Sequence, residues 1–169
     1  MKILVKLKNK EAVCLVDDDV AELIAGYSWR MNDRNYVRTS KYMGMKDGKE
    51  IKKEVQIHRL IMDAPVNLEV DHINGNPLDN RRSNLRLCNR NQNKANTRIV
   101  STNTSGYKGV SKHKGKWQAS IRINNKLCYL GRFLTKERAA LEYNKRALQE
   151  WGEFAWLNPI PRAKDMAGA

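Results

Sequence analysis

The sequence has few cysteines, and their spacing suggests no shared role. Among its 169 residues only Cys14, Cys88 and Cys128 are cysteines, and no two of them form a Cys-x-x-Cys pair. This spacing excludes the common zinc-ribbon pattern and offers no disulfide framework. We therefore expect a protein of a reducing compartment.

Long apolar runs are also missing. No stretch of 18 consecutive apolar residues occurs, and the first residues do not have the pattern of a signal peptide. A helix needs about 20 such residues to span a bilayer, and a secretory signal has a recognisable apolar centre. We therefore expect a soluble, cytoplasmic protein without a membrane partner.

Acidic residues are missing from one long stretch of the chain. Between Arg81 and Lys136 there are 14 Lys or Arg residues and no Asp or Glu. The rest of the chain has equal numbers of basic and acidic residues, so the net charge of +14 arises in this stretch. A solvated basic surface is the usual explanation for a run of charge, but one this long without acids favours a polyanionic partner.

The length and the change of composition along the chain predict two small domains. Residues 98–106 (RIVSTNTSG) are small, polar and turn-forming, which is typical of a connection. We expect an N-terminal domain at 1–97, a linker at 98–105, a C-terminal domain at 106–160 and a tail at 161–169. The predicted fold class is α+β.

The N-terminal half predicts strands with short helical pieces. Strands are expected at 2–7 and 12–16 around a turn at 8–10, a second hairpin turn at 46–49, and a short helix at 58–62. The acidic triplet 17–19 is expected to cap a helical turn at 20–25, with metal binding as the alternative. His58 is expected to be structural, with a phosphate contact as the alternative.

The C-terminal half predicts a three-stranded antiparallel sheet followed by one helix. The strands are expected at 107–112, 116–123 and 126–133, with tight turns at Lys114-Gly115 and Asn124-Asn125. Thr135 is expected to cap the helix and Gly152 to end it. Within it, apolar residues recur every three or four positions at Ala140, Tyr143, Ala147 and Trp151.

The residue types suited to phosphodiester chemistry are concentrated between Glu69 and Asn96. Asp71 is a hard oxygen ligand for Mg²⁺ or Mn²⁺, and His72 has a pKa suited to a general base. Neighbours in an extended chain point to opposite sides, so one can bind metal while the other faces water. Asn84 is expected to bond to the backbone of its loop, and Asn93 to offer a second metal ligand through its amide oxygen.

The order of these residues resembles the HNH nuclease motif, also called the ββα-metal fold. Asn84 lies 12 residues after His72, and Asn93 lies 21 residues after it. An isolated Asp-His pair is usually a surface turn, whereas the whole set at this spacing is specific. The resemblance implies two strands and a helix around one divalent cation. It assigns His72 and Asn84 to catalysis and Asp71 and Asn93 to the metal, with Asn89 or Asn96 as substitutes for Asn93.

Residues 106–158 resemble the AP2 (ERF-type) DNA-binding domain through the segments GYKGV, GKWQASIRI, YLGRF, ERAALEYNKRA and FAWLN. The resemblance implies a sheet that enters the DNA major groove while the helix supports its other face. Alternation along the second strand puts Trp117 on the apolar face, so its burial is the alternative to DNA contact. The residues assigned to DNA binding are Lys116, Trp117, Ser120, Arg122, Lys126 and Tyr129.

An HNH module joined to an AP2 module resembles the homing endonucleases of phages and mobile introns. The expected function is therefore a Mg²⁺- or Mn²⁺-dependent endonuclease of double-stranded DNA, acting as a monomer or homodimer in the cytoplasm of a phage-infected or intron-bearing bacterial host. A DNA-binding regulator with an inactive nuclease scaffold is the first alternative. A nuclease directed at RNA is the second, because basic charge alone does not distinguish the two polyanions.

Overall fold

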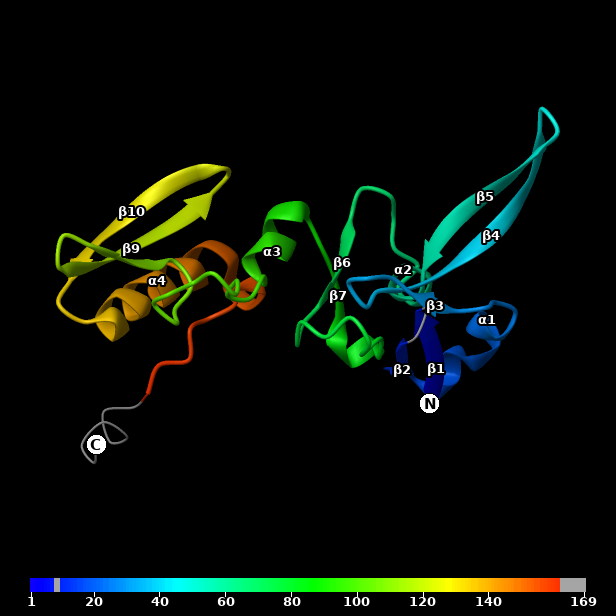
Figure 1. Ribbon diagram of the computed structural model, residues 1–169, viewed down its shortest axis with the longest axis horizontal. Helices are drawn as coiled ribbons and strands as arrows, with labels where there is room; N and C mark the ends of the chain where they lie inside the picture. The colour runs from blue at the N-terminus through cyan, green and yellow to red at the C-terminus, as the bar shows by residue number, and fades with distance from the viewer. Residues whose placement is uncertain (8–9, 162–169) are drawn as a thin grey trace. The chain divides into compact units, whose positions relative to one another are not determined.

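The protein is described by a computed structural model that covers residues 1–7 and 10–161 and forms two compact units (Figure 1). Unit 1 spans Met1–Arg90, and unit 2 begins at Asn91. Helices and strands are mixed in the chain, which confirms the predicted α+β class. The predicted turn at 8–10 and the predicted tail fall largely on residues outside this description.

Unit 1 is built on a five-stranded sheet with the order β2-β1-β3-β4-β5, in which only β1 and β3 run parallel. Its core consists of fully buried apolar side chains, including Val5, Val16, Val20, Val37 and Ile57. The strands are β1 (Lys2–Leu7), β2 (Lys10–Leu15), β3 (Arg30–Met31), β4 (Val37–Lys46) and β5 (Lys49–Gln56).

The acidic triplet lies where the sequence predicts it but bonds differently. A 3-10 turn (Asp18–Val20) leads into α1 (Ala21–Ala25), and Asp17 occupies the capping position without a side-chain bond to the turn. Instead, Asp17 accepts the backbone N–H of Arg82 at 2.7 Å. The predicted capping bond is therefore wrong, because the distant backbone donor takes the carboxylate and ties the loop at residue 82 to the sheet.

Strands β4 and β5 continue past the sheet as a two-stranded ribbon (Figure 1, cyan). β3 pairs with β4 only at Val37 and Arg38, so the strand residues beyond have each other as partners. The turn at Asp47-Gly48 has φ values of 50° and 72°, which is the left-handed conformation of a tight hairpin. This confirms the predicted turn at 46–49.

A second, smaller sheet carries the residues of chemical interest. β6 (Glu69–His72) pairs antiparallel with β7 (Leu85–Cys88), and a 3-10 turn (Arg82–Asn84) precedes β7. The predicted short helix is present as α2 (Ile57–Ile61). Ile57 and Ile61 of this helix and Val70 of β6 belong to the same buried core, so the small sheet is fixed to the large one.

Unit 2 contains a three-stranded antiparallel sheet with the order β10-β9-β8 and the long helix α4 (Lys136–Trp151). Its elements are α3 (Arg90–Ala95), β8 (Val110–His113), β9 (Lys116–Ile123) and β10 (Lys126–Phe133), followed by a 3-10 turn (Gly152–Phe154). Thr135 caps α4 by accepting the N–H of Arg138 at 3.2 Å, as predicted. The core between sheet and helix includes Ala119, Ile121, Ala140, Tyr143 and Ala147.

The first strand of this sheet is shorter than predicted. It begins at Val110 because side-chain bonds hold the preceding segment in a turn: Ser105 Oγ and Asn103 Nδ2 both donate to the carbonyl of Tyr107. Gly109, at φ 74°, follows this turn, and a Cβ there would lie 2.1 Å from Cδ2 of Tyr143. Only glycine permits this close approach of strand to helix.

Within the described part of the chain, no helix combines the length and apolar character needed to span a membrane.

Candidate active site

Asp71 and His72 stand side by side at the end of β6. Each is 5% exposed, and in the antiparallel register Asp71 lies opposite Arg86 and His72 opposite Leu85. Because alternate residues of a strand point to opposite faces, the carboxylate and the imidazole are directed to different sides of the small sheet. This is the arrangement that the sequence predicts for the pair.

The imidazole of His72 is held by Asn80. His72 Nε2 lies 3.2 Å from Asn80 Oδ1. The amide group of Asn80 has its own partners, since Nδ2 donates to the carbonyl of Pro77 at 3.0 Å and to Sγ of Cys14 at 3.2 Å. An amide oxygen only accepts hydrogen bonds, so the ring proton sits on Nε2 and the proton-accepting lone pair on Nδ1.

Burial determines the charge of His72. It lowers the pKa of this imidazole, while the bond with Asn80 and the carboxylates of Asp71 and Asp79 act in the opposite direction with smaller effect. The ring is consequently neutral near neutral pH. A neutral imidazole with a fixed tautomer is the form that can accept a proton from water.

Two further rings pack against His72. The ring centroid of His58, on α2, lies 5.1 Å from that of His72 at an interplanar angle of 78°, and Tyr36 lies within 6 Å of both, at 5.7 and 5.9 Å. Burial, together with His72 and Arg59, lowers the pKa of His58 to about 3. His58 is 4% exposed and its Nδ1 has no hydrogen-bond partner among the described residues. This packing is that of a structural histidine.

Asn84 ties together the two ends of the loop between β6 and β7. Its Nδ2 donates to the carbonyl of Asp79 at 2.7 Å, and its Oδ1 accepts the N–H of Asn74 at 2.9 Å. Both partners are backbone atoms of the loop, which confirms the hydrogen bonding predicted for Asn84. Asn84 thus positions the segment that carries His72 and Asn80.

An ion pair closes the same loop. Arg81 donates to both carboxylate oxygens of Asp79, from Nε to Oδ1 at 2.7 Å and from Nη2 to Oδ2 at 2.8 Å. These bonds hold the pKa of Asp79 below its usual value, so the pair remains charged at neutral pH. Asn74 adds a third bond to this carboxylate at 2.9 Å.

The carboxylate of Asp71 is oriented by Arg86 from the neighbouring strand. Arg86 Nε and Nη2 donate to Oδ2 of Asp71 at 2.9 and 2.7 Å. A carboxylate has about four lone-pair sites, so one that accepts from an arginine can also bind a cation. Its hard oxygen donors fit Mg²⁺, which keeps several waters and binds through one or two carboxylates.

Asn93, the second predicted metal ligand, lies on α3 and therefore in unit 2. α3 is fixed there by several bonds: Asn91 Nδ2 donates to Asn124 Oδ1 at 3.0 Å, and the ammonium of Lys108 donates to the carbonyls of Ala95 and Thr97 at 2.7 and 2.6 Å. Asn89 precedes α3, and Asn96 follows it and is buried. The structure thus groups Asp71, His72 and Asn84 in unit 1 and assigns Asn93 to the other unit.

The face of the unit 2 sheet turned away from α4 is polar, and we call it the outer face. Alternation and strand register assign to it Ser111, His113, Lys116, Gln118, Ser120, Arg122, Leu127, Tyr129 and Arg132. Four of the predicted DNA-binding residues share this face: Lys116, Ser120, Arg122 and Tyr129. They include a 60% exposed Tyr129 and an Arg122 that donates to the carbonyl of Asn125 at 3.1 Å.

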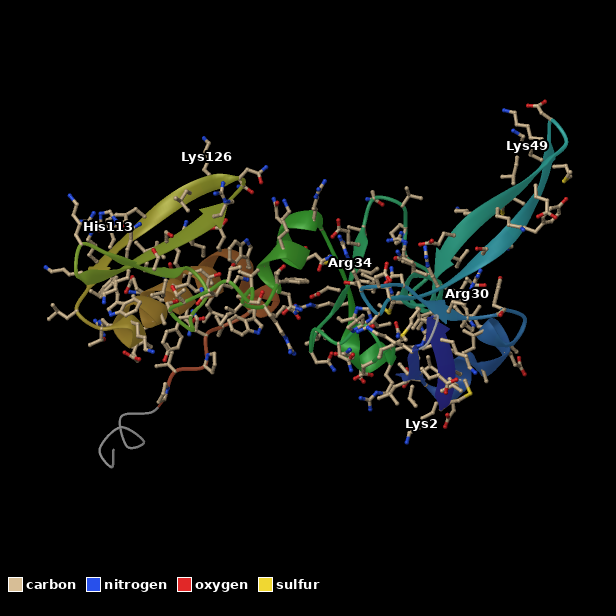
Figure 2. All side chains as sticks on the ribbon, viewed as in Figure 1. Lys2, Arg30, Arg34, Lys49, His113 and Lys126 are labelled. Carbon is tan, nitrogen blue, oxygen red and sulfur yellow. The ribbon has the colours of Figure 1, made fainter. Side chains whose placement is uncertain are left out.

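The other two predicted DNA-binding residues lie elsewhere. Trp117 is partly buried against the cluster of Val110, Ala119 and Ala140 on the α4 side, which is the alternative that alternation indicated. Lys126 is opposite Ile123 in the register and is exposed at the β9–β10 turn (Figure 2).

Asn80 and Arg86 are the residues at the site that sequence reasoning missed. Asn80 is one of many asparagines in its loop, and nothing in the motif spacing singles it out. In the sequence, Arg86 stands out only as one of the 14 basic residues between Arg81 and Lys136. The antiparallel register of two short strands would have identified it as the residue opposite Asp71, but sequence alone does not give that register.

Unit 1 thus brings together a neutral, oriented histidine and a carboxylate on β6, which is joined to β7 by a loop held by several hydrogen bonds. The sequence profile described as HNH endonuclease matches residues 55–95. Over 155 residues the chain is 31% identical to an uncharacterized HNH endonuclease of Acanthamoeba polyphaga mimivirus, an alignment that covers 90% of this chain and 78% of the relative. The chain therefore belongs to the HNH endonuclease family and is a nuclease.

The C-terminal part is similar to plant DNA-binding proteins. Dehydration-responsive element-binding protein 2E of Oryza sativa subsp. japonica is 45% identical over 67 residues, which are 37% of this chain and 21% of that protein. An AP2-like ethylene-responsive transcription factor of Arabidopsis thaliana is 41% identical over 64 residues, 36% of this chain and 17% of the relative. The predicted AP2-like character of the C-terminal sheet and helix is confirmed.

Proposed function

We propose that this chain is a divalent-metal-dependent, homing-type endonuclease of double-stranded DNA, with His72 as its general base. The observation that carries the proposal is the fixed tautomer of His72. The bond from Nε2 to Asn80 leaves Nδ1 as the proton acceptor, and burial keeps the ring neutral. Phosphodiester hydrolysis needs such a base for the attacking water.

The other residues of unit 1 support this role. Asp71, oriented by Arg86, would hold the cation. The second ligand expected from the sequence, Asn93 with Asn89 or Asn96 in its place, stays a prediction. A bound Mg²⁺ or Mn²⁺ supplies positive charge to the phosphoryl and leaving oxygens. Asn84 and Asn80 keep the histidine segment in one conformation, so little reorganisation is needed when a water is deprotonated.

Target choice is proposed to reside in unit 2. A site with one base and one cation has little sequence preference, so a separate surface must provide it. The outer face offers Lys116, Ser120, Arg122 and Tyr129 on strands, and the major groove admits β-strands whose side chains can reach base edges. The division between nuclease at 1–97 and reader at 106–160 is part of this proposal.

Supercoiled plasmid provides the test. The parental chain with Mg²⁺ or Mn²⁺ should convert it to nicked or linear DNA, and EDTA should stop the reaction. His72→Ala should cleave about 10²–10⁴-fold more slowly, because it lacks the base, yet bind DNA as the parent does. Cleavage by His72→Ala at the parental rate would contradict the assignment. A monomer with one site would give nicked product, whereas a dimer could cut both strands and give linear product.

One observation favours the alternative of a DNA-binding regulator with an inactive nuclease scaffold. Arg86 already neutralises Asp71, the carboxylate proposed to hold the cation. Calorimetric titration with Mn²⁺ separates the two functions. Binding that is lost in Asp71→Ala supports the nuclease, whereas absence of both binding and plasmid cleavage in the parental chain supports the regulator.

A further inference from the structure

The β4–β5 ribbon of unit 1 has two faces of different charge. Beyond Arg38 its strand residues pair only with each other, and a bulge between Tyr42 and Gly44 shifts the register by one residue. Alternation then sorts the side chains into two sets. One face has Lys41, Lys46, Lys49, Ile51 and Lys53, and we call it the lysine face; the other has Arg38, Ser40, Tyr42, Met45, Glu50, Lys52 and Glu54.

The lysine face has no acidic residue. On the opposite face the charges are balanced in pairs, since Arg38 bonds to Glu54 and Lys52 bonds to Glu50 at 2.5 Å. All four lysines of the lysine face are exposed. The charges of the opposite face cancel, so the excess of basic over acidic residues in the ribbon lies on the lysine face.

The lysines also stand directly opposite one another. Lys41 pairs across the ribbon with Lys53, and Lys46 pairs with Lys49 (Figure 2 labels Lys49 near the tip). Like charges at directly opposite positions destabilise a strand pair. Two such pairs, separated on this face by Gly44 and Ile51, are unfavourable for the ribbon alone, and a polyanion bound along the face would relieve the repulsion.

We propose that the lysine face, which belongs to unit 1, is a second DNA-binding surface. Its lysines contact the phosphates of the DNA duplex. This inference rests on the proposed function, since it names an additional contact with the same substrate. A two-stranded ribbon has the width that the major groove of B-DNA admits. Lysine is a point charge without the fork of arginine, so this surface contacts phosphates rather than reading bases.

Ile51 supports this assignment. It lies on the lysine face between Lys53 and Lys49 and is 42% exposed. An apolar side chain flanked by cations matches the alternation of phosphate and sugar along a DNA strand. The alternative is that these lysines only prevent aggregation through the edge strand, as lysines on edge strands often do. The experiment below distinguishes this role from DNA binding.

The experiment compares two charge-matched double variants of the full chain. Lys41→Gln/Lys53→Gln removes one pair from the lysine face, and Arg38→Gln/Lys52→Gln removes the same charge from the other face. Binding to a fluorescein-labelled, mixed-sequence 30-base-pair duplex is measured by anisotropy at several salt concentrations in EDTA, so that cleavage plays no part. The melting temperature of the first variant should not fall, because its substitutions relieve repulsion.

The lysine-face variant should show a slope of log K against log salt about two units shallower, since each phosphate contact contributes about 0.9. The control should keep the parental slope. Equal losses in both variants, or no loss in either, would overturn the lysine face while leaving the proposed function standing. If the parental chain bound no duplex at all, the proposed function would fail and this inference with it.

Discussion

The loop between β6 and β7 and the outer face of the unit 2 sheet are both rich in polar residues, but they use them in opposite ways. In the loop, Asp79, Asn80 and Asn84 are buried, and the side chain of each is bonded to neighbouring side chains or to the backbone. On the outer face, Lys116, Arg122 and Tyr129 are exposed. Catalysis requires atoms that are already in position, whereas binding a long polyanion requires charge that can reach outward.

Apart from removal of His72 itself, the largest expected effect is at Asn80, which orients the proposed base. Asn80→Ala should lower the cleavage rate about 10–100-fold, as loss of an orienting partner typically does. The lost bond had raised the pKa of His72, so the acid side of the pH–rate profile should move to lower pH. The profile is measured with labelled duplex under single-turnover conditions.

Asn80→Asp is the matched variant, because a carboxylate in the same place stabilises the imidazolium. Its profile should move to higher pH instead. If Asn80→Ala and Asn80→Asp shifted the pH–rate profile in the same direction, the role of Asn80 would be packing alone. Thermal melts confirm that both variants are folded.

The second prediction concerns the boundary between the units. A fragment of residues 91–161 should be more stable to denaturant than one of residues 104–161, by about 2 kcal/mol. The shorter fragment lacks the carbonyls of Ala95 and Thr97 that accept from Lys108, and hydrogen bonds to charged groups contribute roughly 1.5–3 kcal/mol. Equal stabilities would support a boundary at the predicted linker, 98–105.

The third prediction is that acid destabilises unit 1 more than unit 2. The folded pKa of His58 is about 3, below its ordinary value of 6.5, so the unfolded chain binds a proton first as the pH falls. The contribution of neutral His58 to the free energy of unfolding is therefore fully present above pH 6.5 and is lost as the pH falls below that value. Between pH 6.5 and 5 the loss is about 2 kcal/mol, at roughly 1.4 kcal/mol per pH unit.

Chemical denaturation of the full chain at the two pH values measures this effect. His58→Phe should remove much of the dependence while keeping a ring against Tyr36. His113→Gln, at an exposed histidine of unit 2, serves as the control and should leave the dependence unchanged. An unaltered dependence in His58→Phe would assign the effect to another group.

The smallest effect is expected at Arg122. A good pair between arginine and guanine contributes about 1–3 kcal/mol of discrimination, and we expect the low end because the guanidinium already donates to the carbonyl of Asn125. Arg122→Ala should therefore bind a target selected from random DNA about 1 kcal/mol less well, relative to scrambled DNA. Lys114→Ala, at an exposed turn, should weaken both duplexes equally. Equal losses for Arg122→Ala would show that it reads no base.

The sequence predicted the sheet of unit 2 well because every signal there is local. Alternation defines β9 and β10 to the residue, the paired asparagines at 124 and 125 adopt the left-handed turn, and Thr135 caps the helix. β8 was overextended, since the side-chain bonds of Asn103 and Ser105 to one carbonyl carry no periodic signal.

The sequence singles out the spaced residues of the candidate site but not their hydrogen-bond partners. Asp71, His72 and Asn84 follow a motif, but Arg86 and Asn80 contact them through strand register and a folded loop. The lysine face escaped detection for a related reason. Charge read along the chain combines the two faces of a strand, whereas β-strand geometry separates alternate residues, so the excess of basic residues in this ribbon falls on one face.

The paired lysines of the ribbon also bear on how an endonuclease finds its site. Point charges that contact phosphates hold every sequence equally well, so they do not trap the protein at a wrong position. Such contacts let a protein slide and hop along the duplex and shorten the three-dimensional search. A ribbon with Lys41, Lys46, Lys49 and Lys53, and no arginine on that face, is suited to speed of encounter rather than to residence at one sequence.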